Sequence, residues 1–484
     1  MPKGKPTASE HPLLCDFYEL TMMNGLFESG KAQEIVYFDM FFREVPDGGG
    51  FAIAAGLQQL IEYIENLRFD RDSIDFLRAK GGFSEGFLQY LENFKFTGDI
   101  RAMPEGTPIF PSEPFVTVRA PAIEAQLLET TMLVTINHQS LIATKAARIT
   151  KAAGGRTVLE FGARRAHGAE AAFYGARAAY IGGCAGTSCT LAEMYFGVPA
   201  GGTMAHSWVQ MFDDEYDSFR TYCEIYPDNT TLLVDTYDVL RSGVPNAIRA
   251  IKDVLIPKGI ESYAIRLDSG DLAYLSRQAR RMLDEAGLPN CKIVASNSLD
   301  EHIITELLYQ GAQIDVFGVG ERLITAKSSP VFGGVYKLVG QEDSVGNVIP
   351  KIKISENHTK ITIPGAKRVY RLYQDGMAAA DLICLADEDA PNGEPLEIFD
   401  PDAIWKRKVL ENYTVRELLE PIFEQGKLVY TAPSLHETRE YCREQIDLLW
   451  EEVRRFERPH NYYVDLSLRL WYLRQDLLTA KSHT

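Results

Sequence analysis

The chain has 484 residues, a length that predicts two or three domains. Hydrophobic residues make up 45% of the sequence and charged residues 24%, as in a globular protein with a sizeable core. The formal net charge of -17 argues against nucleic acid as a partner. An acidic chain that binds phosphates must gather its cations at one place.

The first 135 residues predict an N-terminal α+β domain. In chain order, the patterns indicate a strand over 35–40, helices over 57–66 and 84–94, strands over 100–118, and a long helix from Pro121 to about Ala153.

The sequence pattern changes in residues 136–345, where short apolar runs alternate with helical patterns. The predicted strands are 157–161, 201–204, 231–234, 262–267, 292–295 and 314–317, and the predicted helices are 168–181, 245–256, 271–286 and 300–310. The helix over 271–286 has the clearest apolar spacing, with Ser269 placed to cap it. Repeated βα units imply a parallel sheet, either closed as a barrel or open.

Seven polar or glycine-containing clusters follow these strand-like runs. A barrel gathers the carboxyl ends of all its strands around one mouth, whereas an open sheet offers mainly one crevice. We therefore favour an irregular (β/α) TIM-like barrel as the catalytic domain. The clusters are Phe161–Arg165, Gly186–Ser188, Gly202–His206, Asp235, Arg266–Asp268, Ser296–Asn297 and Gly318–Gly320.

Residues 346–484 predict a C-terminal region that packs on the N-terminal domain, with strands over 351–355 and 367–373 and helical patterns over 435–456. The seven cysteines are odd in number and include no Cys-x-x-Cys pair, which predicts free thiols and neither disulfides nor a zinc site. The sequence shows no apolar signal core and no run long enough to span a bilayer, so we expect a cytoplasmic protein without a membrane partner.

His206 is the candidate nucleophile or base. It lies within Gly201–Ser207, where a glycine pair, a hydroxyl and a small residue allow the backbone to approach an anion closely. A solvated loop histidine is the alternative explanation for this residue taken alone.

The segment Arg266–Asp271 places a guanidinium, two carboxylates and a glycine turn where a strand passes into a helix. Arginine offers a planar fork for phosphate or carboxylate, and the helix N-terminus adds N–H donors. Asp268 could accept hydrogen bonds from ribose hydroxyls or bind phosphate-bound Mg²⁺. A capping turn with an Arg266–Asp268 salt bridge is the alternative.

Gly318-Val319-Gly320 is a glycine loop of the kind whose amides cradle phosphate, although a tight turn also explains it. The sequence lacks Gly-x-Gly-x-x-Gly at the start of a βα unit and Gly-x-x-x-x-Gly-Lys-Ser/Thr, which disfavours dinucleotide-binding and P-loop folds.

The ordered motifs closely resemble the nicotinate phosphoribosyltransferase family of type II phosphoribosyltransferases. The resemblance implies an irregular α/β barrel with an added N-terminal domain, and a homodimer in which Tyr18 completes the site of the partner subunit. It also implies nicotinate, 5-phosphoribosyl 1-diphosphate (PRPP) and ATP as substrates, with Mg²⁺ held mainly by the diphosphate. The matching motifs are Asp16–Met22, Phe161–Arg165, Gly186–Ser188, Gly202–Ser207, Arg266–Asp271 and Gly333–Val339.

The resemblance also implies a role for each matching residue. His206 corresponds to a histidine phosphorylated by ATP, and Asp235 to a carboxylate that hydrogen-bonds it and fixes its tautomer. The implied nicotinate-site residues are Arg266 and Thr203, with Tyr18 and Phe161 sandwiching the pyridine ring. The implied ribose and phosphate residues are Arg164, Asp268, Ser296, Asn297, Gly318 and Gly320.

The sequence departs from the family pattern after Gly320, where many relatives carry threonine and this chain has Glu321. A carboxylate beside a phosphate is repulsive unless Mg²⁺ or Arg322 intervenes. Thr325 becomes the candidate substitute for the phosphate-binding hydroxyl. Nicotinamide or quinolinate phosphoribosyl transfer, or ligand sensing on the same barrel, are the alternative functions. The His206 motif disfavours quinolinate, and the retention of Arg266 and Asp268 disfavours a sensor.

Overall fold

The computed structural model describes residues 11–357 and 360–481. It divides the chain into two compact units, one built from residues 1–141 and 331–484 and the other from residues 142–330. The first and last sections expected from the sequence therefore fall in the first unit, and most of the section predicted as 136–345 forms the second. Within the described residues, no helix is long and apolar enough to cross a membrane.

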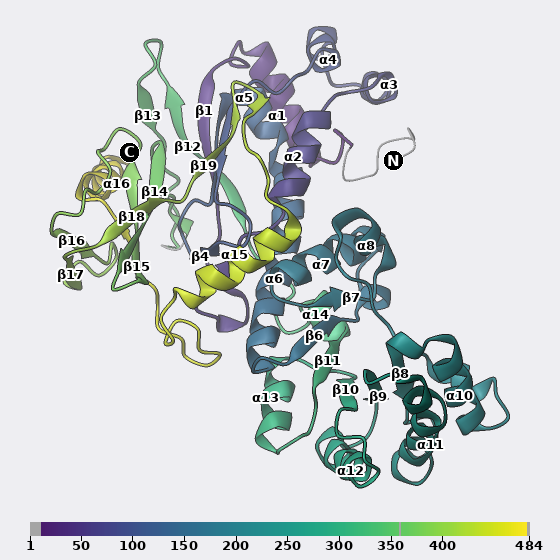
Figure 1. The fold of residues 1–484 in the computed structure, drawn as a ribbon. Coiled ribbons are helices and arrows are strands. Elements are labelled where there is room, and N and C mark those ends of the chain that lie inside the picture. The colour runs from purple at the N-terminus through teal and green to yellow at the C-terminus, as the bar shows by residue number, and fades with distance from the viewer. Residues whose placement is uncertain (1–10, 358–359, 482–484) are drawn as a thin grey trace. The chain divides into compact units, whose positions relative to one another are not determined.

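A seven-stranded sheet organises the first unit, with strand order β13-β12-β1-β5-β3-β19-β20. Its centre is antiparallel, because β1 pairs with β12 on one side and β5 on the other. Figure 1 shows β1, β12 and β19 in this sheet. The strands are β1 (Ile35–Phe41), β3 (Asp99–Ala102), β5 (Val116–Pro121), β12 (Val335–Glu342), β13 (Val348–Pro350), β19 (Glu420–Glu424) and β20 (Lys427–Leu428).

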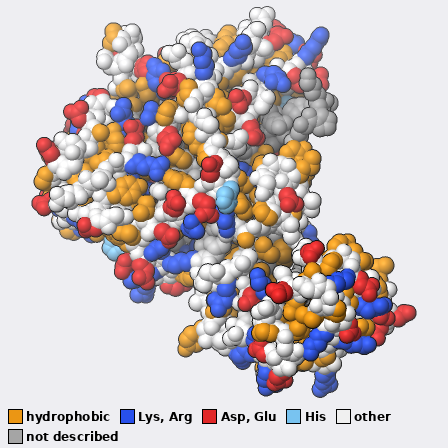
Figure 2. Space-filling view, in the orientation of Figure 1, with side chains coloured by type: hydrophobic (Ala, Val, Ile, Leu, Met, Phe, Trp, Pro, Cys, Tyr) orange, Lys and Arg blue, Asp and Glu red, His pale blue; other side chains and the backbone are white. Residues whose placement is uncertain are grey.

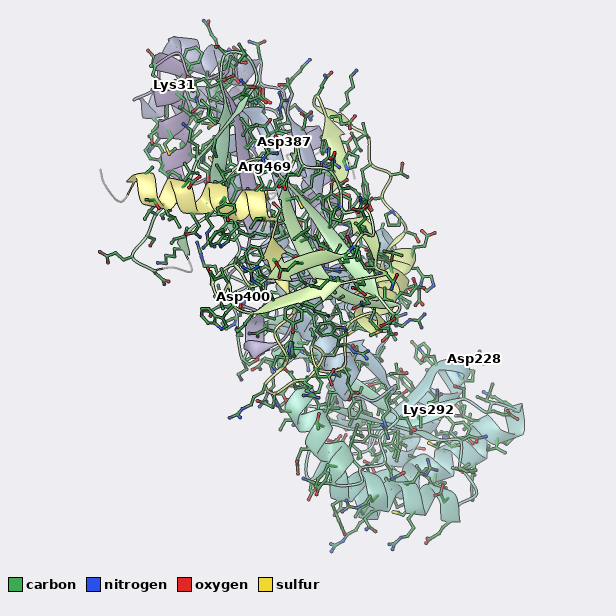
Figure 3. The ribbon with its side chains drawn as sticks, turned by 90° about the vertical axis from the view of Figure 1, so that its left-hand side faces the viewer. Lys31, Asp228, Lys292, Asp387, Asp400 and Arg469 are labelled. Atoms are coloured by element: carbon green, nitrogen blue, oxygen red, sulfur yellow. The ribbon has the colours of Figure 1, made fainter. Side chains whose placement is uncertain are left out.

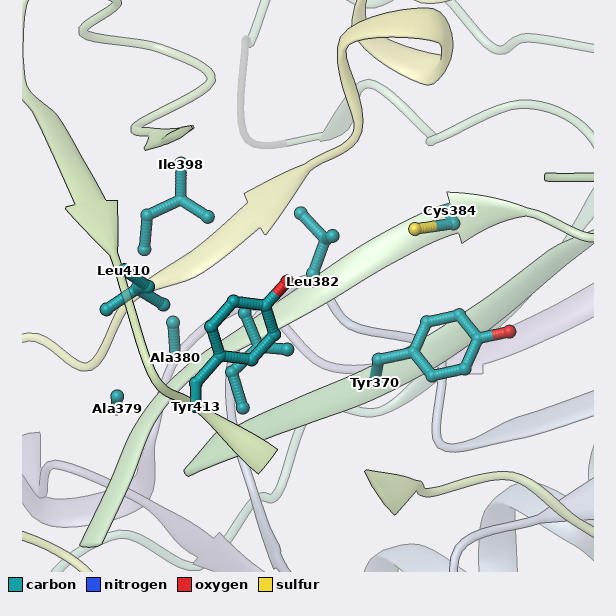
Figure 4. Close-up of a cluster of buried hydrophobic side chains, with 9 residues drawn as sticks. Tyr370, Ala379, Ala380, Leu382, Cys384, Ile398, Leu410 and Tyr413 are labelled. Atoms are coloured by element: carbon teal, nitrogen blue, oxygen red, sulfur yellow. The ribbon is translucent and has the colours of Figure 1, made fainter. Parts of the chain in front are cut away.

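A second sheet of the first unit has the order β18-β14-β15-β21. One face of β14 and β15 packs in an apolar cluster that includes Tyr370, Leu382 and Tyr413 (Figure 4). Within the same sheet, Arg371 and Asp381 form a fully buried ion pair at 2.6 Å. The strands are β14 (Lys367–Gln374), β15 (Met377–Leu385), β18 (Thr414–Glu417) and β21 (Val464–Leu466).

Helices and two small ladders complete the first unit. The helices are α1 (Phe17–Glu28), α2 (Leu57–Asn66), α3 (Arg71–Lys80), α4 (Glu85–Glu92), α5 (Ala122–Leu127), α15 (Leu435–Asp447) and α16 (Leu468–Lys481), and α6 (Glu129–Ala152) runs from the first unit into the second. The ladders pair β2 (Ala52–Ile53) with β4 (Pro108–Ile109) and β16 (Leu396–Phe399) with β17 (Arg407–Leu410). On the surface, Arg469 of α16 lies beside Asp387 (Figure 3), and the two form an exposed ion pair at 2.7 Å.

The second unit contains a curled sheet of six parallel strands in the order β7-β6-β11-β10-β9-β8. The first strand in sequence, β6, pairs with both β7 and the last strand, β11, so the order is circular. Ala200 adds one parallel bridge beside β7. No ladder of described residues joins this edge of the sheet to β8, the strand at the other edge. The strands are β6 (Thr157–Glu160), β7 (Gly186–Thr187), β8 (Thr230–Leu233), β9 (Tyr263–Leu267), β10 (Lys292–Ser296) and β11 (Val316–Val319).

Helices cover the outer side of this sheet, and Figure 1 shows α11, α12 and α13 arranged around β8–β11. Apolar residues recur along α12 at helical spacing, which explains why this helix was the clearest in the sequence. The helices are α7 (Ala169–Ile181), α8 (Thr190–Phe196), α9 (His206–Gln210), α10 (Glu215–Ile225), α11 (Val244–Ala250), α12 (Leu272–Glu285), α13 (Glu301–Tyr309) and α14 (Glu321–Ile324).

Three local predictions were wrong. Residues 201–204 form no strand, because only Ala200 bridges to the edge of the parallel sheet. Residues 351–355 form no strand either, because the pairing of β13 with β12 ends at Pro350. Asp271 rather than Ser269 caps α12, since its side chain accepts the Tyr274 N–H. On the face in Figure 2, acidic and basic side chains are interspersed, and neither sign of charge dominates that face.

Candidate active site

His206 is the first residue of the short helix α9, where the chain leaves the sheet edge at Ala200. Its side chain is 42% exposed, so a solvent-borne phosphate donor can reach it. The Nδ1 atom lies 3.2 Å from the Thr236 hydroxyl, and Nε2 lies 3.9 Å from Oδ2 of Asp268. One ring nitrogen is thus tied to a hydroxyl while the other faces a carboxylate.

Arg266 joins the ends of three neighbouring segments. Its Nε donates to the Ser296 hydroxyl at 2.9 Å, Nη1 to the Thr203 hydroxyl at 3.0 Å, and Nη2 to Asp268 at 2.7 Å. The side chain is only 15% exposed. Since β9 and β10 are adjacent parallel strands, their carboxyl ends deliver Arg266 and Ser296 to the same edge.

Asp268 is the carboxylate shared by this network. It accepts hydrogen bonds from Arg266 and from the Ser296 hydroxyl. Burial opposes ionisation of Asp268, but these two hydrogen bonds and the charge of Arg266 hold its pKa below the usual value. Asp268 is therefore an anion that remains charged next to the imidazole of His206.

The expectation that Asp235 hydrogen-bonds the histidine was wrong for this structure. Oδ2 of Asp235 accepts the Asp268 N–H at 3.0 Å and the Ser269 hydroxyl at 2.6 Å. Its Oδ1 is buried without a hydrogen-bond partner in the described residues. The Asp235 carboxylate therefore binds the loop after β9 and positions Asp268. Thr236 is the residue that hydrogen-bonds the imidazole.

Phe161, Gly318 and Gly320 meet where β6 and β11 end. The Phe161 N–H donates to the Val319 carbonyl at 2.7 Å. A Cβ added to Gly318 would lie 2.5 Å from the Phe161 ring, so this position requires glycine. Gly320 lies almost as close, with 3.1 Å from a built Cβ to the Phe161 carbonyl oxygen.

Glu160 stabilises the turn that carries Phe161. Its carboxylate accepts the Gly162 N–H and, at 2.6 Å, the Thr187 hydroxyl, which links the ends of β6 and β7. Arg164 follows in the 3₁₀ turn Ala163–Arg165, with its side chain exposed. A cation is thus presented beside the Phe161 turn.

The chain leaves β10 in an unusual conformation, with φ of 87° at Asn297 and 51° at Ser298. Two consecutive non-glycine residues in the left-handed region are costly, and such strain concentrates at ligand sites. The ion pair of Arg322 with Asp300 links this segment to α14.

Glu321 forms its ion pair with Lys327, whose ammonium lies 2.7 Å from the carboxylate, whereas Arg322 pairs with Asp300. The hydrogen bond and charge of Lys327 hold the pKa of Glu321 below its usual value. The hydroxyl of Thr325 donates to the Glu321 carbonyl at 2.8 Å, so it is engaged within its own turn. The repulsion expected from a carboxylate in this loop is therefore offset locally.

Tyr18 belongs to the first unit, on α1, and its side chain is 45% exposed. Burial and the nearby charges of Glu129 and Glu19 raise the pKa of Tyr18 to about 12. Much of the residue remains open to solvent.

The structure therefore brings six of the residues expected from the sequence together: five are joined by hydrogen bonds, and His206 lies 3.9 Å from Asp268. Sequence reasoning missed Thr236 and Glu160, although they directly adjoin Asp235 and Phe161, and it predicted Ser269 as a helix cap and not as a partner of Asp235. The signal available was a hydrogen-bonding residue next to a strand end. The six grouped residues are Thr203, His206, Asp235, Arg266, Asp268 and Ser296.

Comparison with known proteins assigns this chain to a family. Three family models match successive parts of the chain: the nicotinate phosphoribosyltransferase N-terminal domain at residues 13–137, the family model at 157–338, and the C-terminal domain at 366–474. Nicotinate phosphoribosyltransferase from Bacillus subtilis is 45% identical over 458 residues, which cover 94% of this chain and 93% of that protein. The chain belongs to the nicotinate phosphoribosyltransferase family. It is thus related to enzymes of NAD biosynthesis along almost its whole length.

Solved structures of nicotinate phosphoribosyltransferases include close matches to this fold. The human nicotinic acid phosphoribosyltransferase structure matches with a TM-score of 0.83 at 30% identity, covering 96% of this chain and all of that one. A structure titled nicotinate-nucleotide pyrophosphorylase, from Pyrococcus furiosus, matches with a TM-score of 0.69 at 26% identity, covering 92% and 98% of the two chains. The mixed α/β fold with its curled parallel sheet is therefore that of the family.

Proposed function

We propose that the protein transfers a phosphoribosyl group from PRPP to nicotinate, coupled to ATP hydrolysis through a phosphohistidine at His206. The products are nicotinate mononucleotide, diphosphate, ADP and phosphate. The observation that carries the proposal is the guanidinium of Arg266, held by three side chains next to the Asp268–His206 pair. It combines a carboxylate receptor with a nucleophile in one group.

The remaining donors of Arg266 suit a carboxylate. A guanidinium has five N–H groups, and three of them are used by Ser296, Thr203 and Asp268. One N–H remains on each terminal nitrogen, the pair that a carboxylate accepts side by side. Because the three partners fix the fork before the substrate arrives, binding costs little further side-chain ordering. This arrangement favours nicotinate over nicotinamide.

His206 is suited to accept the γ-phosphoryl group of ATP. When the Nδ1–H donates to the Thr236 hydroxyl, Nε2 keeps its lone pair for attack on phosphorus. The N–P bond forms as the bond from the γ-phosphorus to the bridging oxygen breaks, and ADP leaves. The phosphorylated ring adds about two negative charges beside Asp268, which strengthens the binding of nearby cations.

In the transfer step, the pyridine nitrogen attacks C1 of the ribose while the bond from C1 to the diphosphate oxygen breaks. Positive charge develops on the ribose, so the protein acts mainly by positioning and charge stabilisation. Asp268 is the anion nearest the histidine that can stabilise this charge. Phe161 and Tyr18 are the proposed stacking partners of the pyridine ring. The glycine loop, Arg164 and the Ser296-Asn297 segment are the proposed phosphate and ribose contacts.

We assign Mg²⁺ mainly to the diphosphate oxygens of the substrate and not to a set of protein ligands. The described residues contain no group of three or more His, Cys, Asp or Glu side chains placed to hold a metal ion. Asp268 is the one carboxylate we assign to it, in support of the diphosphate oxygens that Mg²⁺ prefers. Bound there, the ion would neutralise charge on the leaving diphosphate.

Three further proposals concern the closure of the barrel, the oligomeric state and the location of the protein in the cell. The circular order of the parallel strands supports a TIM-like barrel that is closed except between Ala200 and β8. The exposed apolar residues of α1, Phe17, Tyr18 and Met22, support a homodimer in which this helix completes the partner's site. A cytoplasmic location fits small-molecule substrates and seven free cysteines.

The deciding assay supplies PRPP, Mg²⁺ and ATP with nicotinate, nicotinamide or quinolinate in turn. Mononucleotide formed from nicotinate, at a rate that ATP increases, supports the proposal. Product from nicotinamide and not from nicotinate would overturn it. Sedimentation of the same preparation tests the homodimer, since a monomer that retains full activity would contradict the shared site.

A further inference from the structure

Glu160 is a buried carboxylate at the end of β6 that the transfer chemistry above does not use. Its side chain is fully buried, and burial raises its pKa against the hydrogen bonds from Thr187 and Gly162. No cation among the described residues pairs with it. Because a buried carboxylate without a cation lowers stability, packing alone does not account for this residue.

The carboxylate of Glu160 joins the turn after β6 to the end of β7. Oε1 accepts the Gly162 N–H, and Oε2 accepts the Thr187 hydroxyl at 2.6 Å. Glu160 and Thr187 are partners in the parallel pairing of β6 and β7, so their side chains leave the sheet on the same face. The Thr187 oxygen in turn accepts the Cys189 N–H at 3.0 Å, which extends the connection into the loop after β7.

Phe161 lies between the two points at which this turn is held. Its own N–H donates to the Val319 carbonyl at 2.7 Å, and the next N–H, that of Gly162, is held by Glu160. The ring packs on the backbone of Gly318, where a built Cβ would lie 2.5 Å from a ring carbon, and it is only partly buried. With the backbone fixed on both sides, the ring has few orientations open to it.

We propose that Glu160 and Thr187 are positioning residues that orient Phe161 for the pyridine ring of nicotinate. Glu160 holds the backbone at Gly162, and Thr187 holds the carboxylate of Glu160. The inference rests on the proposed function, in which Phe161 stacks on nicotinate. Both side chains are fully buried, so neither reaches the substrate. Stacking is present before and during the transfer, so its loss weakens nicotinate binding and leaves the chemical step unchanged.

The turn affects affinity through the fraction of the protein that is ready to bind. When the Thr187 hydroxyl is removed, Glu160 loses one of its two donors and is free to move away from Gly162. The Phe161 ring then adopts other orientations, and the apparent affinity for nicotinate falls in proportion to the time spent in them. The loss of one hydrogen bond to a charged group shifts such an equilibrium about tenfold.

Steady-state kinetics of the full chain test the link between the two side chains. We expect Thr187→Val to raise the KM for nicotinate about tenfold, with kcat and the KM for PRPP within about twofold of the wild type. Thr187→Ser keeps the hydroxyl and should stay within about threefold. Glu160→Gln accepts from only one of the two donors and should also raise the KM about tenfold. The double variant of Glu160→Gln and Thr187→Val should resemble either single variant, because both break the same bond.

A Phe161→Ala background shows whether the effect acts through the ring. This substitution should itself raise the KM for nicotinate, because it removes the proposed stacking partner. Adding Thr187→Val should then change the KM by less than about twofold, since no ring remains to be oriented. A further tenfold rise would show that Thr187 acts on another part of the site, and it would overturn the inference.

Asp315→Ala is the matched control for a general loss of stability. The Asp315 carboxylate accepts the Ile293 N–H at 2.8 Å, so it joins β10 to the start of β11 at the amino ends of these strands, away from the site. We expect a lower melting temperature and an unchanged KM for nicotinate. A rise in KM as large as that of Thr187→Val would show that any loosening of the sheet has this effect, which would contradict a specific positioning role.

An unchanged KM in Thr187→Val would overturn the inference, and so would single effects that multiply in the double variant or an equal rise in the KM for PRPP. If Glu160→Gln fails to fold, Thr187→Val and Thr187→Ser decide, since valine replaces the hydroxyl by a methyl group of similar size. A wild-type protein that makes no mononucleotide from nicotinate refutes the proposed function as well. An active wild type with a normal KM in Thr187→Val refutes only the positioning role.

Discussion

Replacing Arg266 by lysine separates its charge from its geometry. The guanidinium is held by Ser296, Thr203 and Asp268 and keeps one N–H on each terminal nitrogen for the substrate. Lysine retains the positive charge but cannot present two parallel donors. The substitution therefore removes one of the two charged hydrogen bonds proposed for the nicotinate carboxylate.

The loss of one charged hydrogen bond costs about 2 kcal/mol, which lowers kcat/KM for nicotinate about 30-fold. Nicotinamide carries no charge, so the lost bond to its neutral carbonyl costs about 1 kcal/mol, or about fivefold. The preference for nicotinate over nicotinamide should therefore fall about sixfold.

The assay measures kcat/KM for both pyridines and for PRPP in the wild type and Arg266→Lys. A thermal melt controls for the bonds that Arg266 makes within the protein. An equal loss for nicotinate and nicotinamide, or an equal loss carried by the KM for PRPP, would refute the assignment and place the guanidinium on phosphate.

Three further predictions concern the imidazole, a buried ion pair and a buried carboxyl. Thr236→Val removes the Nδ1 partner of the histidine and should slow its phosphorylation about tenfold in single-turnover labelling, while Thr236→Ser should not. Arg371→Ala leaves Asp381 buried without its ion-pair partner and should lower the free energy of unfolding by about 3–5 kcal/mol in urea titrations, whereas Arg469→Ala, at an exposed pair, should change it little. Burial and the charge of Asp381 raise the pKa of Glu113 far above its usual range, so the stability it contributes is present at low pH and is lost as pH rises from about 4. Glu113→Gln should flatten this dependence, and an unchanged slope would show that the carboxyl is ionised in the folded protein.

The sequence predicted those parts of the fold that depend on local periodicity. The helix predicted over 271–286 corresponds to α12, because burial of one face imposes a regular pattern, and the strand predicted over 262–267 corresponds to β9, a largely apolar run that is buried on both faces. The segment 201–204 was wrongly assigned to a strand. Whether such a short segment joins a sheet depends on pairing with a strand from elsewhere in the chain, and the local sequence, a glycine pair followed by an apolar residue, does not show this. Sheet closure depends on such long-range pairing, which local patterns do not contain.

The sequence predicted which residues lie in the candidate site, but not which of them form hydrogen bonds or ion pairs with one another. Polar residues at strand ends were found because parallel strands bring their carboxyl ends together. The exchange of Asp235 for Thr236 as the partner of the histidine depends on how the loop after β9 folds back onto Asp235. Lys327 was not expected as the partner of Glu321, since the two residues are six positions apart and meet only through the turn after α14.

Labelling with γ-phosphate-labelled ATP tests the central claim most directly, because it reports the chemical role of His206 itself. We expect acid-labile label on the wild-type protein, its absence in His206→Ala, and its discharge when PRPP and nicotinate are added together. Acid-labile label that survives in His206→Ala would contradict the account, and so would a wild-type protein that makes nicotinate mononucleotide at a rate independent of ATP.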